Sequence, residues 1–402
     1  MIHSFSCKNF YSFTDLATVS FVVNEKAPDN NGYFVDPSAT RLSKVETVIG
    51  PNASGKTNLL KVLPFLKWLI VDSFIGNPSN SLPVKSFLFS KLKNDPSELS
   101  VDFEIGKNIY TYKFVLNDQK ILAEELRVKS KSAQKVTSKK IFSREWDEKT
   151  GKYLLDDKSF NLPKEFPLRA NASVVSTAIR LTHKESQEIF DFWQKVRTNV
   201  VEAGWAGDRY LRSGSQQLFS ALDFFSEDKN EVLKTEAEKL LSRFDLGLES
   251  FDIKKEKKEN GFSINVQVAH SFGGQTEYLP MQYESSGTKQ LFVLLKTILL
   301  VLDKGGIAVM DEFDVNLHPE IIVALFDLFV QPETNPNNAQ ILFSTHSHLI
   351  LSKLDKYQII LIEKNEKGAS ESWRLDEMSG VRPDDNYYAK YLAGAYGAVP
   401  KL

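Results

Sequence analysis

The sequence lacks several features that whole classes of protein need. It has one cysteine in 402 residues, Cys7, so it can form neither an internal disulfide nor a cysteine-based zinc site. Its longest apolar stretches, 63–75 and 291–302, contain charged residues and are shorter than the ~20 residues of a membrane span. No apolar signal-peptide core follows the first residues. These absences predict a soluble, cytoplasmic protein with no membrane contact.

The sequence also lacks an excess of either charge, with 50 Lys and Arg against 52 Asp and Glu. Any contact with nucleic acid would therefore have to come from a local basic patch. What the sequence has in quantity is apolar: 42% of its residues are hydrophobic and 28 are phenylalanine. This composition argues against disorder and supports a large core. The length predicts two or three domains, or one domain with a large insertion.

The secondary-structure pattern changes along the chain. Strand patterns occupy 99–105, 109–116, 121–128, 251–255, 262–268, 307–310, 341–344 and 358–363. Helical patterns occupy 185–201, 231–244, 290–302, 320–330 and 348–354. The alternation in the last third predicts a mostly parallel sheet covered by helices. We therefore expect an N-terminal lobe (1–165), a helical insertion (166–247) and a C-terminal lobe (248–402).

The segment GPNASGKT at 50–57 fits G-x-x-x-x-G-K-[ST] at every fixed position, between a short strand (45–49) and a helix that begins at Lys56. Its glycines let backbone N–H groups point at phosphate oxygens, and the helix N-terminus adds partial positive charge. Lys56 would reach the β- and γ-phosphates, and the Thr57 hydroxyl would bind Mg²⁺. The predicted ATP-binding residues are Gly50, Pro51, Asn52, Ala53, Ser54, Gly55, Lys56, Thr57 and Asn58.

Two acidic residues, Asp311 and Glu312, follow the apolar run 307–310. Such a run predicts a strand buried on both faces, and ligands bind at the carboxyl ends of these strands. We expect Asp311 to hold Mg²⁺ together with Thr57, and Glu312 to act as the general base for an attacking water. Taken alone, the pair could simply cap a strand; the phosphate loop favours the functional interpretation.

Two further polar segments complete the pattern. His346 follows the apolar strand 341–343, where it could touch the γ-phosphate. The turn SSGTKQ at 285–290 opens a long helix and is either an ordinary N-cap or an anion-binding turn. Only its position between the phosphate loop and the carboxylates favours the anion-binding interpretation.

In this order, GPNASGKT, SSGTKQ, IAVMDEFD and FSTHS resemble the heads of ABC-type ATPases of the SMC, Rad50 and RecF group. More narrowly, CKNFYSF near the start, NASVVSTA at 171–178, DEFDVNLHPE at 311–320 and YLAGAYGAVP at 391–400 resemble AAA15-type bacterial ATPases, which are often components of abortive-infection and anti-phage systems. The resemblance covers most of the chain. It implies an α/β P-loop NTPase of the ABC type, with a mixed N-terminal β region, a mostly parallel core sheet and a helical insertion.

The resemblance also implies that ATP binds between two subunits of a homodimer or higher homo-oligomer. Glu312 and His346 would be catalytic, and Asp314 is similar to the D-loop residue that couples the two sites. The signature residues acting in trans would be Ser286, Gly287, Thr288 and Lys289. Here the sequence departs from the usual L-S-G-G-Q, because Lys289 replaces the glutamine. Tyr11 takes a place where relatives often carry Arg or Lys, and the glutamine that normally links the Mg²⁺ site to the insertion has no evident counterpart.

One basic segment, 126–144, contains no acidic residue. Its cationic residues are Arg127, Lys129, Lys131, Lys135, Lys139, Lys140 and Arg144. It could be a finger that contacts nucleic-acid phosphates, or a solvated hairpin, which is the preferred interpretation.

Together these features predict a slow ATPase, with ATP and Mg²⁺ as cofactors, that closes two heads on ATP and controls an effector protein encoded nearby. The anti-phage role is implied by the resemblance alone. The alternatives are a DNA-repair ATPase of the RecF kind, a non-hydrolysing ATP-bound scaffold or, with least support, a transport subunit. Because no long coiled coil and no nuclease domain after His346 are evident, we expect this chain to supply the energy step rather than the toxic chemistry. His346 and His348 form a pair, but without further ligands nearby no metal site is expected there.

Overall fold

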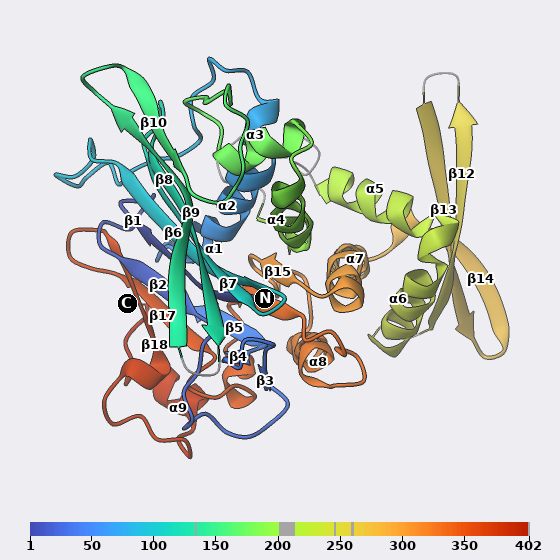
Figure 1. The fold of residues 1–402 in the computed structure, drawn as a ribbon. Coiled ribbons are helices and arrows are strands. Elements are labelled where there is room, and N and C mark those ends of the chain that lie inside the picture. The colour runs from blue at the N-terminus through green and yellow to red at the C-terminus, as the bar shows by residue number, and fades with distance from the viewer. Residues whose placement is uncertain (133–134, 201–213, 245–246, 259–260, 401–402) are drawn as a thin grey trace.

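The computed structural model describes residues 1–132, 135–200, 214–244, 247–258 and 261–400. Two large sheets lie side by side with helices between them, and a smaller sheet with two helices projects from this body (Figure 1). No helix in the described ranges is both long enough and apolar enough to cross a membrane.

The first large sheet is antiparallel and has seven strands in the order β10-β9-β8-β7-β6-β1-β2. Its strands are β1 (Ile2–Lys8), β2 (Ala17–Ser20), β6 (Ser97–Ile105), β7 (Asn108–Leu116), β8 (Ile121–Ser132), β9 (Lys135–Asp147) and β10 (Lys152–Asp157). The three strands expected between 99 and 128 are therefore confirmed, with longer bounds. Buried and solvent-facing residues alternate along β6, as expected for a sheet with one covered face.

The second large sheet forms the core, in the order β11-β15-β16-β5-β17-β18. Its strands are β11 (Val196–Thr198), β15 (Ile307–Met310), β16 (Gln340–Ser344), β5 (Val45–Ile49), β17 (Ile359–Lys364) and β18 (Ser370–Arg374). All neighbours are parallel except the pair β17 and β18. Every residue of β5, β15 and β16 is buried, as expected for strands covered on both faces, and most of these residues are apolar. The predicted mostly parallel core sheet is confirmed.

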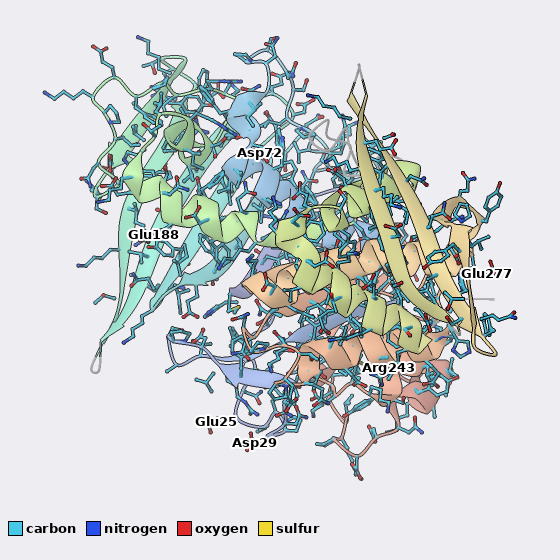
Figure 2. All side chains as sticks on the ribbon, turned by 90° about the vertical axis from the view of Figure 1, so that its right-hand side faces the viewer. Glu25, Asp29, Asp72, Glu188, Arg243 and Glu277 are labelled. Atoms are coloured by element: carbon cyan, nitrogen blue, oxygen red, sulfur yellow. The ribbon has the colours of Figure 1, made fainter. Side chains whose placement is uncertain are left out.

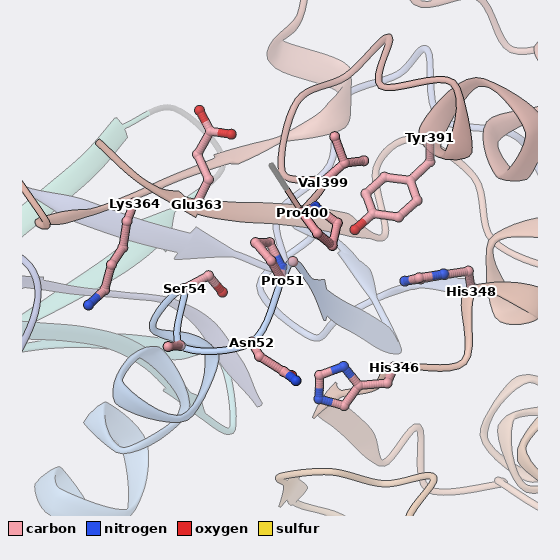
Figure 3. A pocket seen from close by; sticks show the side chains of 12 residues that line it. Pro51, Asn52, Ser54, His346, His348, Glu363, Lys364, Tyr391, Val399 and Pro400 are labelled. Carbon is pink, nitrogen blue, oxygen red and sulfur yellow. The ribbon is translucent and has the colours of Figure 1, made fainter. Parts of the chain in front are cut away.

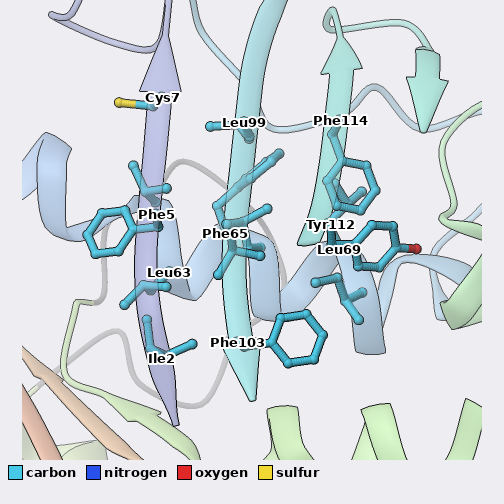
Figure 4. Packing of buried hydrophobic residues seen from close by; sticks show 14 of the residues in the cluster. Ile2, Phe5, Cys7, Leu63, Phe65, Leu69, Leu99, Phe103, Tyr112 and Phe114 are labelled. Atoms are coloured by element: carbon cyan, nitrogen blue, oxygen red, sulfur yellow. The ribbon is translucent and has the colours of Figure 1, made fainter. Parts of the chain in front are cut away.

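Helices cover both faces of the core sheet. Helix α1 (Lys56–Leu60) is followed, after Lys61, by α2 (Val62–Val71), whose first turn contains Pro64. Helix α2 lies behind β1, β6 and β7, where Phe65 and Leu69 pack among the apolar side chains of these strands (Figure 4). The other face carries α7 (Ser286–Lys304) and α8 (Pro319–Val330).

The segment after the first sheet returns to the core. Helices α3 (Val174–Arg180) and α4 (Lys184–Gln194) pack beside α2. The prediction of one helix over 185–201 is wrong, because the helix ends at Gln194 and Val196 begins β11, which pairs with β15. Burial of β-branched Val196 in the core sheet outweighs the helical pattern. The division at 166 and 247 stays a prediction, although part of the proposed insertion contributes a core strand.

The projecting part comprises α5 (Gly214–Phe225), α6 (Glu231–Phe244) and a three-stranded sheet of β12 (Leu248–Lys258), β13 (Gly261–Phe272) and β14 (Gln275–Pro280). Figure 2 shows Arg243 on α6 and Glu277 on β14 in this part. The helix expected over 231–244 is confirmed with these bounds, whereas β14 was not predicted, because five of its six residues are exposed and show no apolar alternation.

Four shorter elements lie close to these parts. Strands β3 (Tyr33–Val35) and β4 (Arg41–Ser43) form a two-stranded sheet, and α9 (Tyr387–Leu392) lies near the C-terminus. The helix expected over 348–354 is a short 3₁₀ helix, His348–Ser352.

Candidate nucleotide site

The loop after β5 has a conformation that only glycine allows at two positions. A β-carbon on Gly50 would lie 2.1 Å from the backbone oxygen of Ile362 on β17. Gly55 has a φ of +114°, and a β-carbon there would lie 2.2 Å from Ser370 Oγ. Between them the chain curls, with the Ser54 N–H donating to the Pro51 oxygen at 3.2 Å. Gly50 is therefore required by a close backbone approach, and Gly55 by its positive φ and by the Ser370 hydroxyl beside it.

Hydrogen bonds among polar side chains hold this loop in place. The Ser370 hydroxyl lies 2.6 Å from the Ser54 oxygen and 2.7 Å from Ser12 Oγ. The amide of Asn58 donates to the same Ser12 Oγ at 2.9 Å. The loop is thus fixed by β18 and by the N-terminal segment, two contacts that the motif does not reveal.

Lys56 extends back along the loop. Its ammonium group donates to the backbone oxygens of Gly50 at 2.8 Å and Pro51 at 3.0 Å, and the residue is 7% exposed. Burial lowers the pKa of Lys56, whereas the carboxylates of Asp311 and Glu312 act in the opposite direction. The positive charge predicted to meet phosphates therefore lies within electrostatic range of both predicted carboxylates.

Ser344 joins the ends of two neighbouring core strands. Its hydroxyl donates to Asp311 Oδ1 at 2.6 Å and accepts from the Glu312 N–H at 2.8 Å. Glu312 adopts a φ of +46°, which is uncommon for a residue with a side chain, and its side chain is exposed. The serine of the Ser-Thr-His motif thus orients both acidic residues, a role that sequence reasoning missed.

Asn199 is a second residue that sequence reasoning missed. Its side-chain amide donates to the Asp311 oxygen at 2.9 Å, and its Oδ1 accepts from the Asp311 N–H at 2.6 Å. It follows β11 directly, so it lies at the carboxyl edge of the core sheet beside β15. A side-chain amide therefore fixes the backbone of Asp311, the predicted Mg²⁺ ligand.

His346 reaches the same edge from β16. Its backbone N–H donates to both carboxylate oxygens of Asp314, at 3.1 and 3.0 Å. Its imidazole is exposed and lies opposite Asn52 in Figure 3. The structure brings together the phosphate loop, Asp311, Glu312, Asp314 and His346, as the sequence predicted; their chemical roles stay predictions.

A pocket of about 490 Å³ opens between this loop and the end of the chain. It is lined by Gly50, Pro51, Asn52, Ala53, Ser54, His346, His348, Glu363, Lys364, Tyr391, Val399 and Pro400 (Figure 3). The C-terminal segment is fixed there, because the Tyr391 hydroxyl donates to the Ala398 oxygen at 2.7 Å and the Ala398 N–H donates to Glu363 at 2.9 Å. Burial and the neighbouring His346 both lower the pKa of His348.

The predicted signature lies at the start of α7. Ser285 caps this helix, since its Oγ accepts from the Thr288 N–H at 3.0 Å. Ser286 is exposed, and Lys289 donates to the Gln282 oxygen at 2.7 Å. A β-carbon on Gly287 would lie 2.8 Å from the Asn316 oxygen. The N-cap is thus present, and no signature residue lines the pocket described above, so action in trans stays a prediction.

The basic segment forms the hairpin of β8 and β9. Arg144 is buried and pairs with Glu124 at 2.7 Å, so it is not available to phosphates. Arg127 pairs with Glu125 at 3.2 Å, and Lys140 pairs with Asp156 at 3.3 Å. Lys129 is half-buried and Lys139 is exposed. The side chains of Lys131 and Lys135 lie outside the described residues.

Comparison with known proteins agrees with this architecture. The family described as "AAA domain, putative AbiEii toxin, Type IV TA system" matches residues 47–352. An SMC head solved in complex with the C-winged helix domain of ScpA is 14% identical, with a TM-score of 0.50 and coverage of 94% of this chain and 98% of that chain. This likeness shows the fold of an SMC-type P-loop ATPase head.

Two further SMC heads are less similar in structure. The one from Thermotoga maritima is 15% identical, with a TM-score of 0.42 and coverage of 93% and 98% of the two chains. The one from Pyrococcus furiosus, solved with an extended coiled coil and the C-terminal domain of ScpA, is 14% identical, with a TM-score of 0.45 and coverage of 94% and 97%. No curated protein matches the sequence.

Proposed function

The chain belongs to the AbiEii-type AAA-domain family, and from this premise we propose that it binds ATP and Mg²⁺ at loop 50–57 and hydrolyses the nucleotide slowly as a molecular switch. The family and the fold identify a P-loop ATPase of the SMC-like type. The observation that supports the finer proposal most strongly is the approach of Lys56, which follows β5, to Asp311 and Glu312, which follow β15 on the other side of β16.

The residues at this edge suit a nucleotide with Mg²⁺. Thr57 supplies a hydroxyl and Asp311 a half-buried carboxylate, which are the hard oxygen ligands that Mg²⁺ prefers. When bound, Mg²⁺ neutralises charge on the phosphate oxygens. The backbone N–H groups of the loop and the Lys56 ammonium would bind the β- and γ-phosphates. Lys56 would exchange its two carbonyl acceptors for phosphate oxygens.

Glu312 is proposed as the residue that takes the proton from the attacking water. Its exposed side chain reaches solvent, and the bond from its N–H to Ser344 fixes its backbone. His346 would contact the γ-phosphate from the adjacent strand. Closure of a second copy over this edge, with Ser286 to Lys289 facing the phosphates, would exclude bulk water and complete the site, as the resemblance implies.

A second pocket, of 330 Å³, is proposed for the nucleotide base. It is lined by Tyr11, Ser12, Asn58, Lys85, Ser86, Phe87, Leu88 and Phe89. It adjoins the phosphate loop through the hydrogen bond between Asn58 and Ser12. Phe89 is 86% exposed and could stack on a base.

The biological role that we propose is control of an effector protein in bacterial anti-phage defence, in the cytoplasm. It rests on the family description, which names a toxin of a type IV toxin–antitoxin system, and on the AAA15 resemblance. ATP would act by binding the closed pair of heads better than the open one, because a ligand shifts an equilibrium only through such a difference.

The test uses the purified chain with ATP and Mg²⁺, in calorimetry and in a phosphate-release assay. We expect Lys56→Ala to abolish detectable binding. Glu312→Gln should keep binding but hydrolyse on the order of 100-fold more slowly, and should dimerise with ATP in light scattering. Glu320→Gln, a substitution of an exposed acid on α8, is the matched control and should behave as the parent.

Each alternative predicts a different result in the same assays. Hydrolysis by Glu312→Gln at the parental rate would show that the base is assigned wrongly. Absence of turnover in the parent would favour an ATP-bound scaffold. Stimulation by DNA that fades with salt and with Lys139→Ala would favour a DNA-repair ATPase.

A further inference from the structure

Three titratable side chains meet at a buried point far from the phosphate loop. His3 belongs to β1, Asp36 follows β3, and Glu104 belongs to β6; each is at most 4% exposed. His3 Nε2 lies 2.7 Å from Asp36 Oδ2 and 3.2 Å from Glu104 Oε2. One ligand atom from each residue lies within 4.8 Å of the other two. The cluster therefore combines an imidazole nitrogen with two carboxylate oxygens.

The hydrogen bonds within the cluster do not satisfy these oxygens. A ring nitrogen carries at most one proton, and His3 Nε2 makes its hydrogen bond with Glu104. Asp36 Oδ1 accepts from the Ser38 hydroxyl at 2.7 Å and the Thr40 N–H at 2.8 Å. Within the described residues, Glu104 Oε1 is buried without a hydrogen-bond partner, and Asp36 Oδ2 has the His3 ring nitrogen 2.7 Å away but no regular hydrogen bond. Unsatisfied buried carboxylate oxygens are costly. The Met1 ammonium attracts both carboxylates, but its hydrogen bond goes to the Glu104 backbone oxygen at 2.9 Å, so a ligand that contacts the carboxylate oxygens directly would still stabilise them.

We propose that His3, Asp36 and Glu104 bind a divalent transition-metal ion, with Zn²⁺ as the best-fitting ion. Three nitrogen and oxygen ligands from the protein plus one water form a common zinc coordination set. The imidazole favours zinc over Mg²⁺ or Ca²⁺, which prefer oxygen ligands alone. Two carboxylates and a neutral histidine would balance the charge of the ion. The proposal does not depend on ATP binding.

The position of the cluster indicates a structural role. The neighbouring Ile2 N–H donates to Gln340 Oε1 at 2.8 Å, and Gln340 is the first residue of β16. The site therefore lies near the amino end of the core sheet, whereas Asp311 lies at the carboxyl end. A bound ion would link β1, β6 and the segment after β3.

A shared proton is the competing way to satisfy the cluster. Burial raises the pKa of Glu104. Burial acts in the same direction on Asp36, but hydrogen bonds from Glu104, Thr40 and Ser38 outweigh it and lower the pKa of Asp36. Such a pair could hold one proton between its oxygens in the place where a metal ion would lie. The experiment must therefore count metal ions directly.

The experiment measures zinc by mass spectrometry after growth with zinc and extensive dialysis, without nucleotide. Every sample carries Asp311→Asn, so that the predicted Mg²⁺ site does not contribute. We expect about one zinc ion per chain, falling below about 0.1 in His3→Asn and in Glu104→Gln. His183→Asn is the matched control, because His183 also contacts a carboxylate, Glu185 at 3.3 Å, but no third ligand joins them within the described residues. It should keep the parental zinc content.

A measurement on the unsubstituted chain guards against misfolded variants. X-ray absorption at the zinc edge should show only nitrogen and oxygen ligands, and zinc added to chelator-treated protein should raise its melting temperature. The proposal is overturned if the parent holds no stoichiometric zinc, which is the result expected if a shared proton occupies the cluster instead. A folded His3→Asn that keeps a full equivalent, or a sulfur ligand in the spectrum, would overturn it as well.

Discussion

The two ends of the core sheet carry polar clusters of opposite character. At the carboxyl end, Asp311 and Ser344 satisfy each other by hydrogen bonds, while Glu312 and His346 reach solvent. At the amino end, His3, Asp36 and Glu104 are buried, and Glu104 Oε1 has no hydrogen-bond partner among the described residues.

This difference teaches how polar residues near the two ends of the core sheet divide between chemistry and stability, although His3 and Glu104 belong to β1 and β6 of the antiparallel sheet. Exposed groups on a satisfied framework can exchange partners with a ligand at little cost to the fold. Buried groups with unmet acceptors depend on each other, so removing one leaves the others unpaired. Substitutions at the carboxyl end should therefore change activity, and those at the amino end should change stability.

The largest effect is expected from Asp36→Ala. It leaves His3, Ser38 and Thr40 without their buried partner and should lower the free energy of unfolding by about 3–5 kcal/mol. Hydrolysis per folded molecule should stay at the parental level. Urea denaturation provides the measurement, and Asp29→Ala, in an exposed turn, provides the control (Figure 2). A change of less than about 1 kcal/mol would remove the contrast between the two ends.

Asp311→Asn is expected to change activity rather than stability, because the asparagine oxygen can still accept the hydrogen bond from the Ser344 hydroxyl. Hydrolysis should fall about 100-fold, which is about 2.7 kcal/mol in transition-state stabilisation, because the Mg²⁺ ligand is lost. Unfolding should be nearly unchanged. Phosphate release and thermal unfolding, compared with exposed Asp327→Asn on α8, check both statements. Parental turnover would contradict the assignment of Asp311.

A smaller effect on turnover is expected from Asn199→Ala, which removes the two hydrogen bonds that fix the Asp311 backbone. We expect kcat to fall on the order of 10-fold with little change in ATP affinity, as for a positioning residue. Asn337→Ala is a matched control, since Asn337 also bonds to backbone oxygens, of Leu302 and Asp303, but away from Asp311. An equal loss of kcat in both variants would refute a specific role for Asn199.

The smallest effect concerns Cys7, which lies on the same strand as His3 and is fully buried. Burial raises the pKa of its thiol to about 12. The folded state therefore holds this proton more tightly than the unfolded state, and the stabilisation is complete below about pH 9 and is lost as the pH rises toward 12. By pH 10 the parent should lose about 1 kcal/mol more than Cys7→Ala, measured by denaturation at each pH. If the stability of the parent and of Cys7→Ala changed in parallel with pH, burial would not raise the pKa of this thiol.

The sequence predicted best what short segments determine alone. The β-branched run 45–49 and the apolar run 307–310 became strands with these bounds, because short runs of such residues suit buried strands. The phosphate loop could also be predicted, because its whole motif lies within the short segment 50–57. Val196 was misassigned because its strand exists only through pairing with β15, more than 100 residues later in the chain.

The parts of the sites that escaped prediction depend on distant contacts. Asn199 bonds to a residue 112 positions away, and His3 meets Glu104 101 positions away. No short spacing in the sequence predicts either contact. The role of Ser344 was equally hidden, because its motif directs attention to His346.

The packing of the C-terminal segment has a practical consequence for affinity tags. Val399 and Pro400 line the pocket beside loop 50–54, so a histidine tag fused there would bring extra imidazoles to the phosphate loop. A tag before Ile2 would instead crowd the hydrogen bond to Gln340 and the neighbouring His3. The turn at Gly273 and Gly274 is a better place, because a side chain at either position would meet no atom within 4 Å.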